Sequence, residues 1–148
     1  MELRKSLDWH LCGFGLHDGL KRLVQHLNYL YKNEPALSEI DDSYEGFEWI
    51  DFHDADNSVV AFLRRDRSGD LLIFAMNATP VPREGYRVGV PENGFYKEIL
   101  NTDSETYGGS NLGNYGGVPS HPWPWQGREH SIQINLPPLA TVGFKLKR

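Results

Sequence analysis

The sequence predicts a mainly β protein, an antiparallel β-sandwich preceded by one amphipathic helix. Apolar residues recur at a helical period between residues 16 and 31. After about residue 40 the apolar period changes to two, in short runs that are separated by turn-forming residues. Because no helical segment lies between these runs, neighbouring strands are joined by turns, which is typical of an antiparallel sandwich rather than of a parallel sheet.

The predicted helix carries one wide apolar stripe. Its members are Leu16, Leu20, Leu23, Val24, Leu27, Leu30 and Tyr31. Asp18 lies in the first turn, where a carboxylate suits the positive end of the helix dipole. Pro35 ends the helix because the residue before a proline is forced out of helical geometry. A sandwich of this size does not need such a helix, so we expect the stripe to pack on something that this chain does not contain.

Seven strands are predicted in the rest of the chain, over residues 47–52, 58–65, 71–79, 86–90, 95–100, 131–136 and 141–147. The pair Asn93-Gly94 is the strongest hairpin signal between neighbouring strands. Residues 71–75 are apolar at every position, so this strand is expected at the centre of the sheet. Residues 101–130 contain six glycines and three prolines, and they predict a long loop that is either functional or held down by its own side chains.

The charge and composition argue against several classes of function. The net charge is −5 and no block of lysine and arginine is dense enough to follow a phosphate backbone, so we expect no nucleic-acid partner. No apolar stretch is long enough to span a bilayer and no export signal is recognisable, so we expect no membrane partner. The single cysteine, Cys12, fits a reducing compartment, and together these features predict a cytoplasmic protein.

The sequence also lacks the residue patterns of the common catalytic and metal sites. The stretch from His53 to Asn57 fails as a calcium loop, because Val59 and Arg65 occupy positions that require glycine and glutamate. The histidines lack the spacing of zinc ligands, and the glycine-rich stretch 108–117 lacks the lysine of a phosphate-binding loop. Most acidic residues stand in turns, with no evident catalytic pair. We therefore expect no catalytic residue, no metal and no cofactor.

The strongest positive signal is aromatic, and it lies in the long loop. Two tryptophans follow prolines in the stretch 121–127, HPWPWQG. Aromatic rings stack on the apolar faces of sugars and amides bond their hydroxyls, which makes candidate carbohydrate contacts of Tyr107, Tyr115, Trp123, Trp125 and Gln126. The alternative is that the two tryptophans seal one end of the sandwich core. We favour a mostly structural loop whose outer rim contacts carbohydrate.

Several short motifs run in order through the chain, from about Ser6 to its end. Among them are EPAL at 34–37, GFEWI at 46–50, LNTD at 100–103, YGGS at 107–110 and LPPLA at 136–140. Together they resemble the closing segment of the bacterial 1,4-α-glucan (glycogen) branching enzymes, which belong to the α-amylase superfamily. The resemblance implies that residues 1–38 are the end of a catalytic (β/α)8 barrel, with its last helix, and that residues 39–148 are a C-terminal all-β sandwich domain.

The resemblance also implies a function for the parent enzyme, in glycogen biosynthesis. Such glycosyltransferases cut an α-1,4-glucan and form α-1,6 branches with an aspartate nucleophile, a glutamate acid/base and a stabilising aspartate. None of those motifs is present in this chain, and His17-Asp18-Gly19 carries no catalytic role because it stands at the start of the helix. We therefore expect a structural domain that contacts α-glucan and is inactive alone. The alternative is a stand-alone carbohydrate-binding or interaction module that has lost the catalytic half.

The implied partners are the missing catalytic barrel, in the same chain or in a separate one, and α-glucan. In the parent enzyme, barrel strands would cover the leucine stripe of the helix. Without them, we expect the chain either to self-associate through Leu16, Leu20, Leu23 and Leu27 or to leave the helix partly frayed. Full burial of one such side chain is worth about 1.5–3 kcal/mol, so several together can drive dimer formation.

Overall fold

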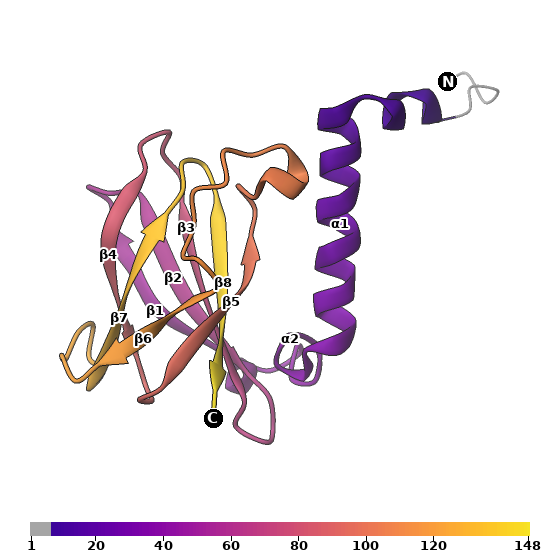
Figure 1. The fold of residues 1–148 in the computed structure, drawn as a ribbon. Coiled ribbons are helices and arrows are strands. Elements are labelled where there is room, and N and C mark those ends of the chain that lie inside the picture. The colour runs from indigo at the N-terminus through magenta and orange to yellow at the C-terminus, as the bar shows by residue number, and fades with distance from the viewer. Residues whose placement is uncertain (1–6) are drawn as a thin grey trace.

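A computed structural model describes residues 7–148, and it places one long helix beside a strongly curved sheet (Figure 1). Ser6, where the resemblance begins, and the five residues before it lie outside the described residues. The helix α1 spans Gly15–Asn33, and the short helix α2 spans Pro35–Ser38. Three 3-10 segments complete the helical part: η1 at Trp9–Gly13, η2 at Tyr44–Gly46 and η3 at Glu105–Tyr107.

Within residues 7–148 the chain forms eight strands, all paired in antiparallel ladders. They are β1 (Phe47–Asp54), β2 (Val59–Arg65), β3 (Leu71–Asn77), β4 (Arg83–Val90), β5 (Phe95–Asn101), β6 (Gly117–His121), β7 (His130–Leu136) and β8 (Thr141–Lys147). Their order in the sheet is β1-β2-β3-β8-β5-β6-β7-β4. This confirms the predicted mainly β, antiparallel architecture, in which the sheet curves so that its two halves face each other.

The strand β6 corrects the prediction of one unbroken loop over residues 101–130. It pairs with β5 on one side and with β7 on the other, and thereby joins the two halves of the sheet. Gly117 and Pro119 lie in this strand, and both residue types are unfavourable in strands. The local pattern therefore predicts a loop. The residues are extended instead because the backbones of β5 and β7 both pair with them.

Alternate residues of the strands point into one main core, as the period of two predicted. Its members include Leu63, Ile73, Val88, Ile132, Leu136, Val142 and Phe144, which are all fully or almost fully buried. The strand β3 lies between β2 and β8 and is buried on both faces, as its unbroken apolar run predicted. Leu71, Ile73 and Ala75 enter the main core, whereas Leu72 and Phe74 enter a second cluster on the opposite face of the sheet.

The helix α1 covers that second cluster with only part of its apolar stripe. Leu30 is buried against Leu72 and Phe74, and Leu23 packs on the edge of the same cluster. Leu16, Leu20, Val24 and Leu27 are instead between 41% and 75% exposed. The stripe is therefore divided: Leu23 and Leu30 at one edge of it face the sheet, and the rest of it is largely exposed to solvent.

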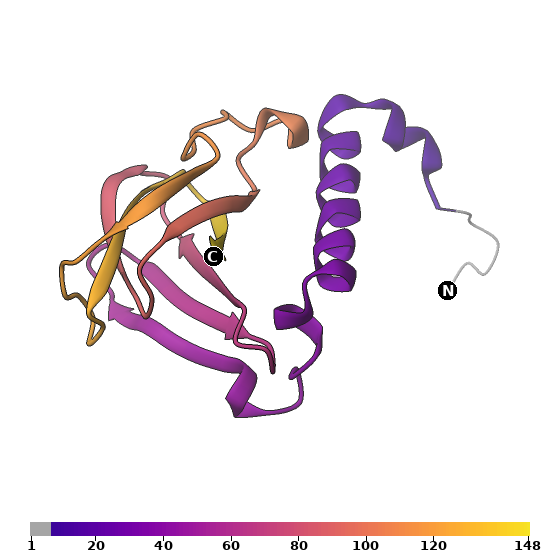
Figure 2. The same cartoon turned by 60° about the horizontal axis from the view of Figure 1, so that its bottom comes forward.

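Contacts near both ends hold α1 against the β domain (Figure 2). Toward its start, Gly19 is buried against the backbone of Tyr107 in η3, and His26 Nδ1 forms a hydrogen bond with the Tyr107 hydroxyl. At its end, Lys145 Nζ on β8 forms an ion pair with Glu34 at 2.6 Å. Asp18 lies in the first turn, as predicted, and Pro35 both follows the end of α1 and begins α2. The helix is continuous over its 19 residues.

Candidate functional site

The five aromatic and amide residues expected to contact carbohydrate lie in three different places. Tyr107 is half-buried between η3 and α1, where its hydroxyl bonds His26. Tyr115 is 98% exposed and lines a small hollow of about 220 Å³ with Glu98 and Asn111. Trp123, Trp125 and Gln126 lie in the loop between β6 and β7, at the end of the domain away from η3 (Figure 1). The structure therefore brings only the last three together.

The first half of the long segment is held down by its own side chains, which was one of the two predicted outcomes. The Asp103 carboxylate accepts a hydrogen bond from the Ser110 backbone N–H at 3.1 Å, and the Asp103 carbonyl accepts one from Asn111 at 2.7 Å. The buried Asn114 amide donates to Glu98 at 2.8 Å and to the Asn135 carbonyl at 3.1 Å. These bonds fix the backbone of the segment on both sides of Tyr107 and Tyr115.

The two tryptophan rings lie on the surface, which argues against the alternative that they seal the core. Trp123 is 59% exposed and Trp125 is 45% exposed. The backbone of the loop does pack on the sheet: a Cβ atom on Gly89 of β4 would overlap the carbonyl oxygen of Trp125. The Trp125 ring is therefore displayed outward from a backbone that is fixed against β4.

A groove of about 780 Å³ begins beside Trp125 and runs between β1 and β4, the two strands that end the sheet order. We call it the β1–β4 groove. Its lining residues come from β1 and the following turn, from β4 and the residue before it, and from the tryptophan loop: Asp51, His53, Asp54, Asn57, Pro82, Arg83, Glu84, Gly85, Tyr86, Arg87, Trp125 and Gln126. The groove is thus built from three segments that are far apart in the sequence.

Hydrogen bonds hold one wall of the groove, around Asp54. The Tyr86 hydroxyl donates to Asp54 Oδ2 at 2.7 Å, and Asn57 donates to Oδ1 from its backbone N–H and its side chain. Burial alone would raise the pKa of Asp54, but the hydrogen bonds from Tyr86 and Asn57 outweigh burial and lower it. Burial, followed by the bond to Asp54, raises the pKa of Tyr86. At neutral pH Asp54 is therefore a carboxylate acceptor, and Tyr86 is a neutral phenol.

Gln126 ties the tryptophan loop to both strands. Its side-chain Nε2 donates to Asp51 Oδ2 on β1 at 2.8 Å, and its Oε1 accepts the Gly89 backbone N–H on β4 at 2.9 Å. Its own backbone has φ of +51°, a left-handed conformation that redirects the chain after Trp125. Close by, the Arg87 guanidinium lies over the Trp123 ring, 4.6 Å from its centre.

The groove offers groups that can form hydrogen bonds and an aromatic ring that can stack. It combines carboxylates, arginines, a phenol and an amide with one exposed indole ring, and these groups are typical of a binding surface. Within residues 7–148, no group of three or more His, Cys, Asp or Glu side chains could hold a metal ion. Over the same residues, no helix is long and apolar enough to cross a membrane.

Sequence reasoning identified Trp125 and Gln126 but missed the groove residues on β1 and β4. The predicted strands at 47–52 and 86–90 contain Asp51 and Tyr86, and Asp54 follows the first of them. The partners of these residues are 32 to 75 positions away, as in the Tyr86–Asp54 and Gln126–Asp51 bonds. No local signal shows that β1 and β4 meet.

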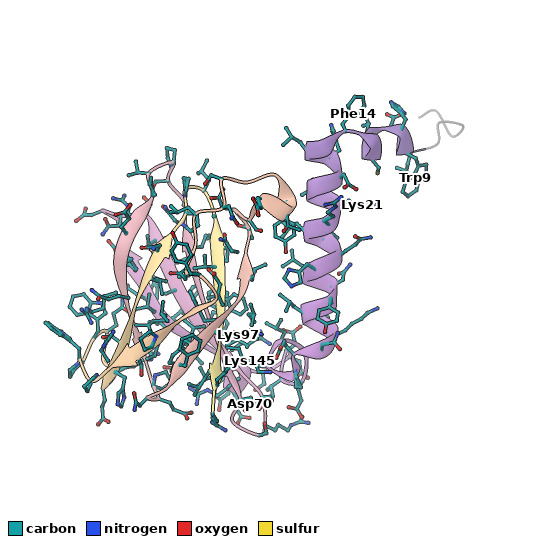
Figure 3. All side chains as sticks on the ribbon, viewed as in Figure 1. Trp9, Phe14, Lys21, Asp70, Lys97 and Lys145 are labelled. Atoms are coloured by element: carbon teal, nitrogen blue, oxygen red, sulfur yellow. The ribbon has the colours of Figure 1, made fainter. Side chains whose placement is uncertain are left out.

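A second exposed feature lies on the other side of the molecule, along α1. We call the exposed side of the helix, with Leu16, Leu20, Val24 and Leu27, its outer face. Trp9 and Phe14 are also exposed at the N-terminal end of the helix, where Figure 3 shows them clear of the sheet and on opposite sides of η1. Toward the other end, Leu27 lines an apolar hollow of about 440 Å³ between the helix and the sheet.

Comparison with known proteins agrees with this architecture. The chain is 51% identical over 141 residues to a 1,4-alpha-glucan branching enzyme GlgB of Aquifex aeolicus, which covers 95% of this chain and 22% of the relative. It is 54% identical over 144 residues to the enzyme of the same name from Paramagnetospirillum magneticum, which covers 97% of this chain and 20% of the relative. The chain therefore spans about a fifth of the length of these relatives. Residues 49–147 match the alpha amylase C-terminal all-beta domain, and the chain belongs to that family.

Proposed function

We propose that this chain serves as the C-terminal portion of a 1,4-alpha-glucan branching enzyme and stabilises the catalytic portion of that enzyme. The identity to relatives of that name over almost the whole chain supports the proposal. In it, residues up to about 38 belong structurally to the catalytic barrel, and the rest form the all-β domain. The reaction itself would be carried out by the four fifths of such an enzyme that lie outside this chain.

The observation that carries the proposal is the outer face of α1. A helix that is held to its own domain by Leu30 and by the His26–Tyr107 bond does not need further leucines exposed beside these contacts. Leu16, Leu20, Val24 and Leu27 nevertheless lie exposed along the helix, and Trp9 and Phe14 are exposed just before it. Such surfaces on a folded domain mark sites of protein contact. Covering the outer face with barrel residues would bury several side chains, each worth about 1.5–3 kcal/mol when fully buried.

A chimera tests this proposal. The branching enzyme of Paramagnetospirillum magneticum would be produced with its matching segment replaced by this chain, which is 54% identical to it. The Leu16→Lys/Leu20→Lys variant places charges on the outer face and should lower the melting temperature and the branching activity of the chimera. The Gln25→Lys/Tyr29→Lys variant adds the same charges at exposed positions on another side of α1 and should leave both unchanged.

Two results would contradict the proposal. An inactive, misassembled chimera with the unmodified chain would show that this chain does not fit a branching enzyme. A chimera insensitive to the Leu16→Lys/Leu20→Lys change would show that the outer face does not contact the catalytic portion. Sedimentation of the isolated chain examines the alternative: a stable dimer that the same lysines abolish would mean that a second copy covers the outer face.

A further inference from the structure

We propose that the β1–β4 groove binds a short stretch of α-glucan, with the Trp125 ring as its stacking surface. The proposal rests on the proposed function for the identity of the polymer. The groove itself specifies the chemistry of the ligand: neutral, rich in hydroxyl groups and bearing an apolar face. Its four lines of support are the size of the groove, its balance of charges, the rigidity of its polar groups and the exposure of Trp125.

The size of the groove suits an oligosaccharide. Its volume of about 780 Å³ lies within the range of about 300–1,000 Å³ that is usual for small-molecule sites. The groove is bounded by the strands β1 and β4, the turn after β1 and the tryptophan loop, so segments that are far apart in the sequence form its walls. Figure 1 shows β4 on the far side of the β domain from α1, so a partner that covers the outer face of the helix does not have to cover this groove.

The charges of the groove favour a neutral ligand. Asp51, Asp54 and Glu84 supply carboxylates, while Arg83 and Arg87 supply guanidinium groups. The carboxylates oppose a phosphate or another anion, and the arginines oppose a free cation. A sugar hydroxyl can donate a hydrogen bond to a carboxylate and can also accept one from a guanidinium group. A neutral sugar can therefore bond to both kinds of group at the same time.

The polar groups are held before any ligand arrives. Asp54 is fixed by Tyr86 and Asn57, and Gln126 is fixed by Asp51 and by the backbone of Gly89. Groups that are already ordered lose little conformational entropy on binding, so more of the contact energy appears as affinity. Carboxylate oxygens have several lone pairs, so these groups can still accept bonds from sugar hydroxyls.

The two tryptophans should contribute differently. Trp125 lines the β1–β4 groove, and its half-exposed ring stands on a backbone pinned to Gly89. Trp123 lines a separate hollow of about 370 Å³, and the Arg87 guanidinium covers one face of its ring. Trp125 is therefore the stacking surface of the groove, and Trp123 lies beside it.

The test is a titration of the purified 148-residue chain with maltoheptaose, an α-1,4-linked oligosaccharide, followed by calorimetry. The unmodified chain should bind it, the Trp125→Ala variant should bind at least tenfold more weakly, and Trp125→Phe should recover part of the loss. The matched control is Trp9→Ala, which removes an exposed tryptophan at the far end of the helix and should not alter binding. Circular dichroism verifies that each variant is folded.

Three outcomes would overturn the inference: no saturable binding of maltoheptaose by the unmodified chain, equal affinity of the Trp125→Ala variant, or equal affinity for the β-1,4-linked cellohexaose. None of them affects the chimera experiment, which depends on α1 rather than on the groove. Conversely, a chimera that fails while maltoheptaose binding depends on Trp125 would reject the docking role and leave a glucan-binding module.

Discussion

Replacing Gly19 with alanine would test how tightly α1 is held against the β domain. A Cβ atom at this position would lie 2.7 Å from the carbonyl carbon of Tyr107 and closer still to its oxygen. Because the obstacle is backbone rather than the end of a flexible side chain, either the helix or η3 must move. That movement would also strain the hydrogen bond between His26 and Tyr107.

The expected loss of stability follows from two contributions that lower the free energy of unfolding and one that raises it. Overpacking of a close contact costs about 1–3 kcal/mol, and the weakened hydrogen bond costs about 0.5–1.5 kcal/mol. Alanine is a better helix former than glycine by about 1 kcal/mol, which offsets part of the loss. We therefore expect Gly19→Ala to lower the free energy of unfolding by about 0.5–3.5 kcal/mol.

Gly15→Ala is the matched control on the same helix. A Cβ atom at Gly15 would meet nothing within 4 Å, so the substitution should be neutral or slightly stabilising. Urea unfolding followed by circular dichroism gives the free energies, and amide exchange along α1 reports whether the helix opens. Equal stability of the two variants, or unchanged exchange protection of α1 in Gly19→Ala, would refute the close packing of the helix on η3.

Four further substitutions have defined outcomes in urea unfolding of the isolated chain. Leu30→Ala removes a side chain that is only 6% exposed and should lower the free energy of unfolding by about 2–5 kcal/mol. Leu16→Ala on the outer face should change it by less than about 0.5 kcal/mol. Equal effects of the two substitutions would contradict the division of the stripe. Asn77→Asp should lower the free energy of unfolding by about 3 kcal/mol, because the buried amide donates to two backbone carbonyls that would then face a carboxylate. An unchanged free energy of unfolding would mean that these two hydrogen bonds do not stabilise the fold. Burial alone would raise the pKa of Asp66, but hydrogen bonds from Ser68 and from backbone amides outweigh it and lower it below the unfolded value of about 3.9. Asp66 thus contributes stability above that pH, which is lost as the pH falls through the lower folded pKa, and Asp66→Asn should weaken this acid dependence; an unchanged profile would contradict it.

The candidate site shows where reasoning from the sequence stops. The exposed tryptophans were identified because proline and tryptophan alternate in HPWPWQG, which local pattern reveals. The grouping of Tyr107 and Tyr115 with them came only from their presence in one glycine-rich segment. Strand β6 divides that segment, so Tyr107 reaches α1 and Trp125 reaches the opposite end of the domain.

The sequence by itself determined the elements and their inward faces. The helical period between residues 16 and 31 predicts α1, and the period of two after residue 40 predicts seven of the eight strands described. The predicted bounds agree with the observed ones to within a few residues. Hydrophobic period and turn chemistry act over a few neighbouring positions, so they can be read without knowledge of the fold. The motifs likewise led to the family, since they are local strings of residues.

Only the tertiary structure decided which faces remain open and which residues meet. It turns Leu23 and Leu30 toward the sheet and leaves Leu16 and Leu20 in solvent, although all four belong to one stripe. It also brings β1 beside β4, the two ends of an eight-strand order, and so creates the groove that Trp125 borders. The order of strands depends on the packing of the whole core, and contacts between distant positions follow from that order rather than from any local pattern.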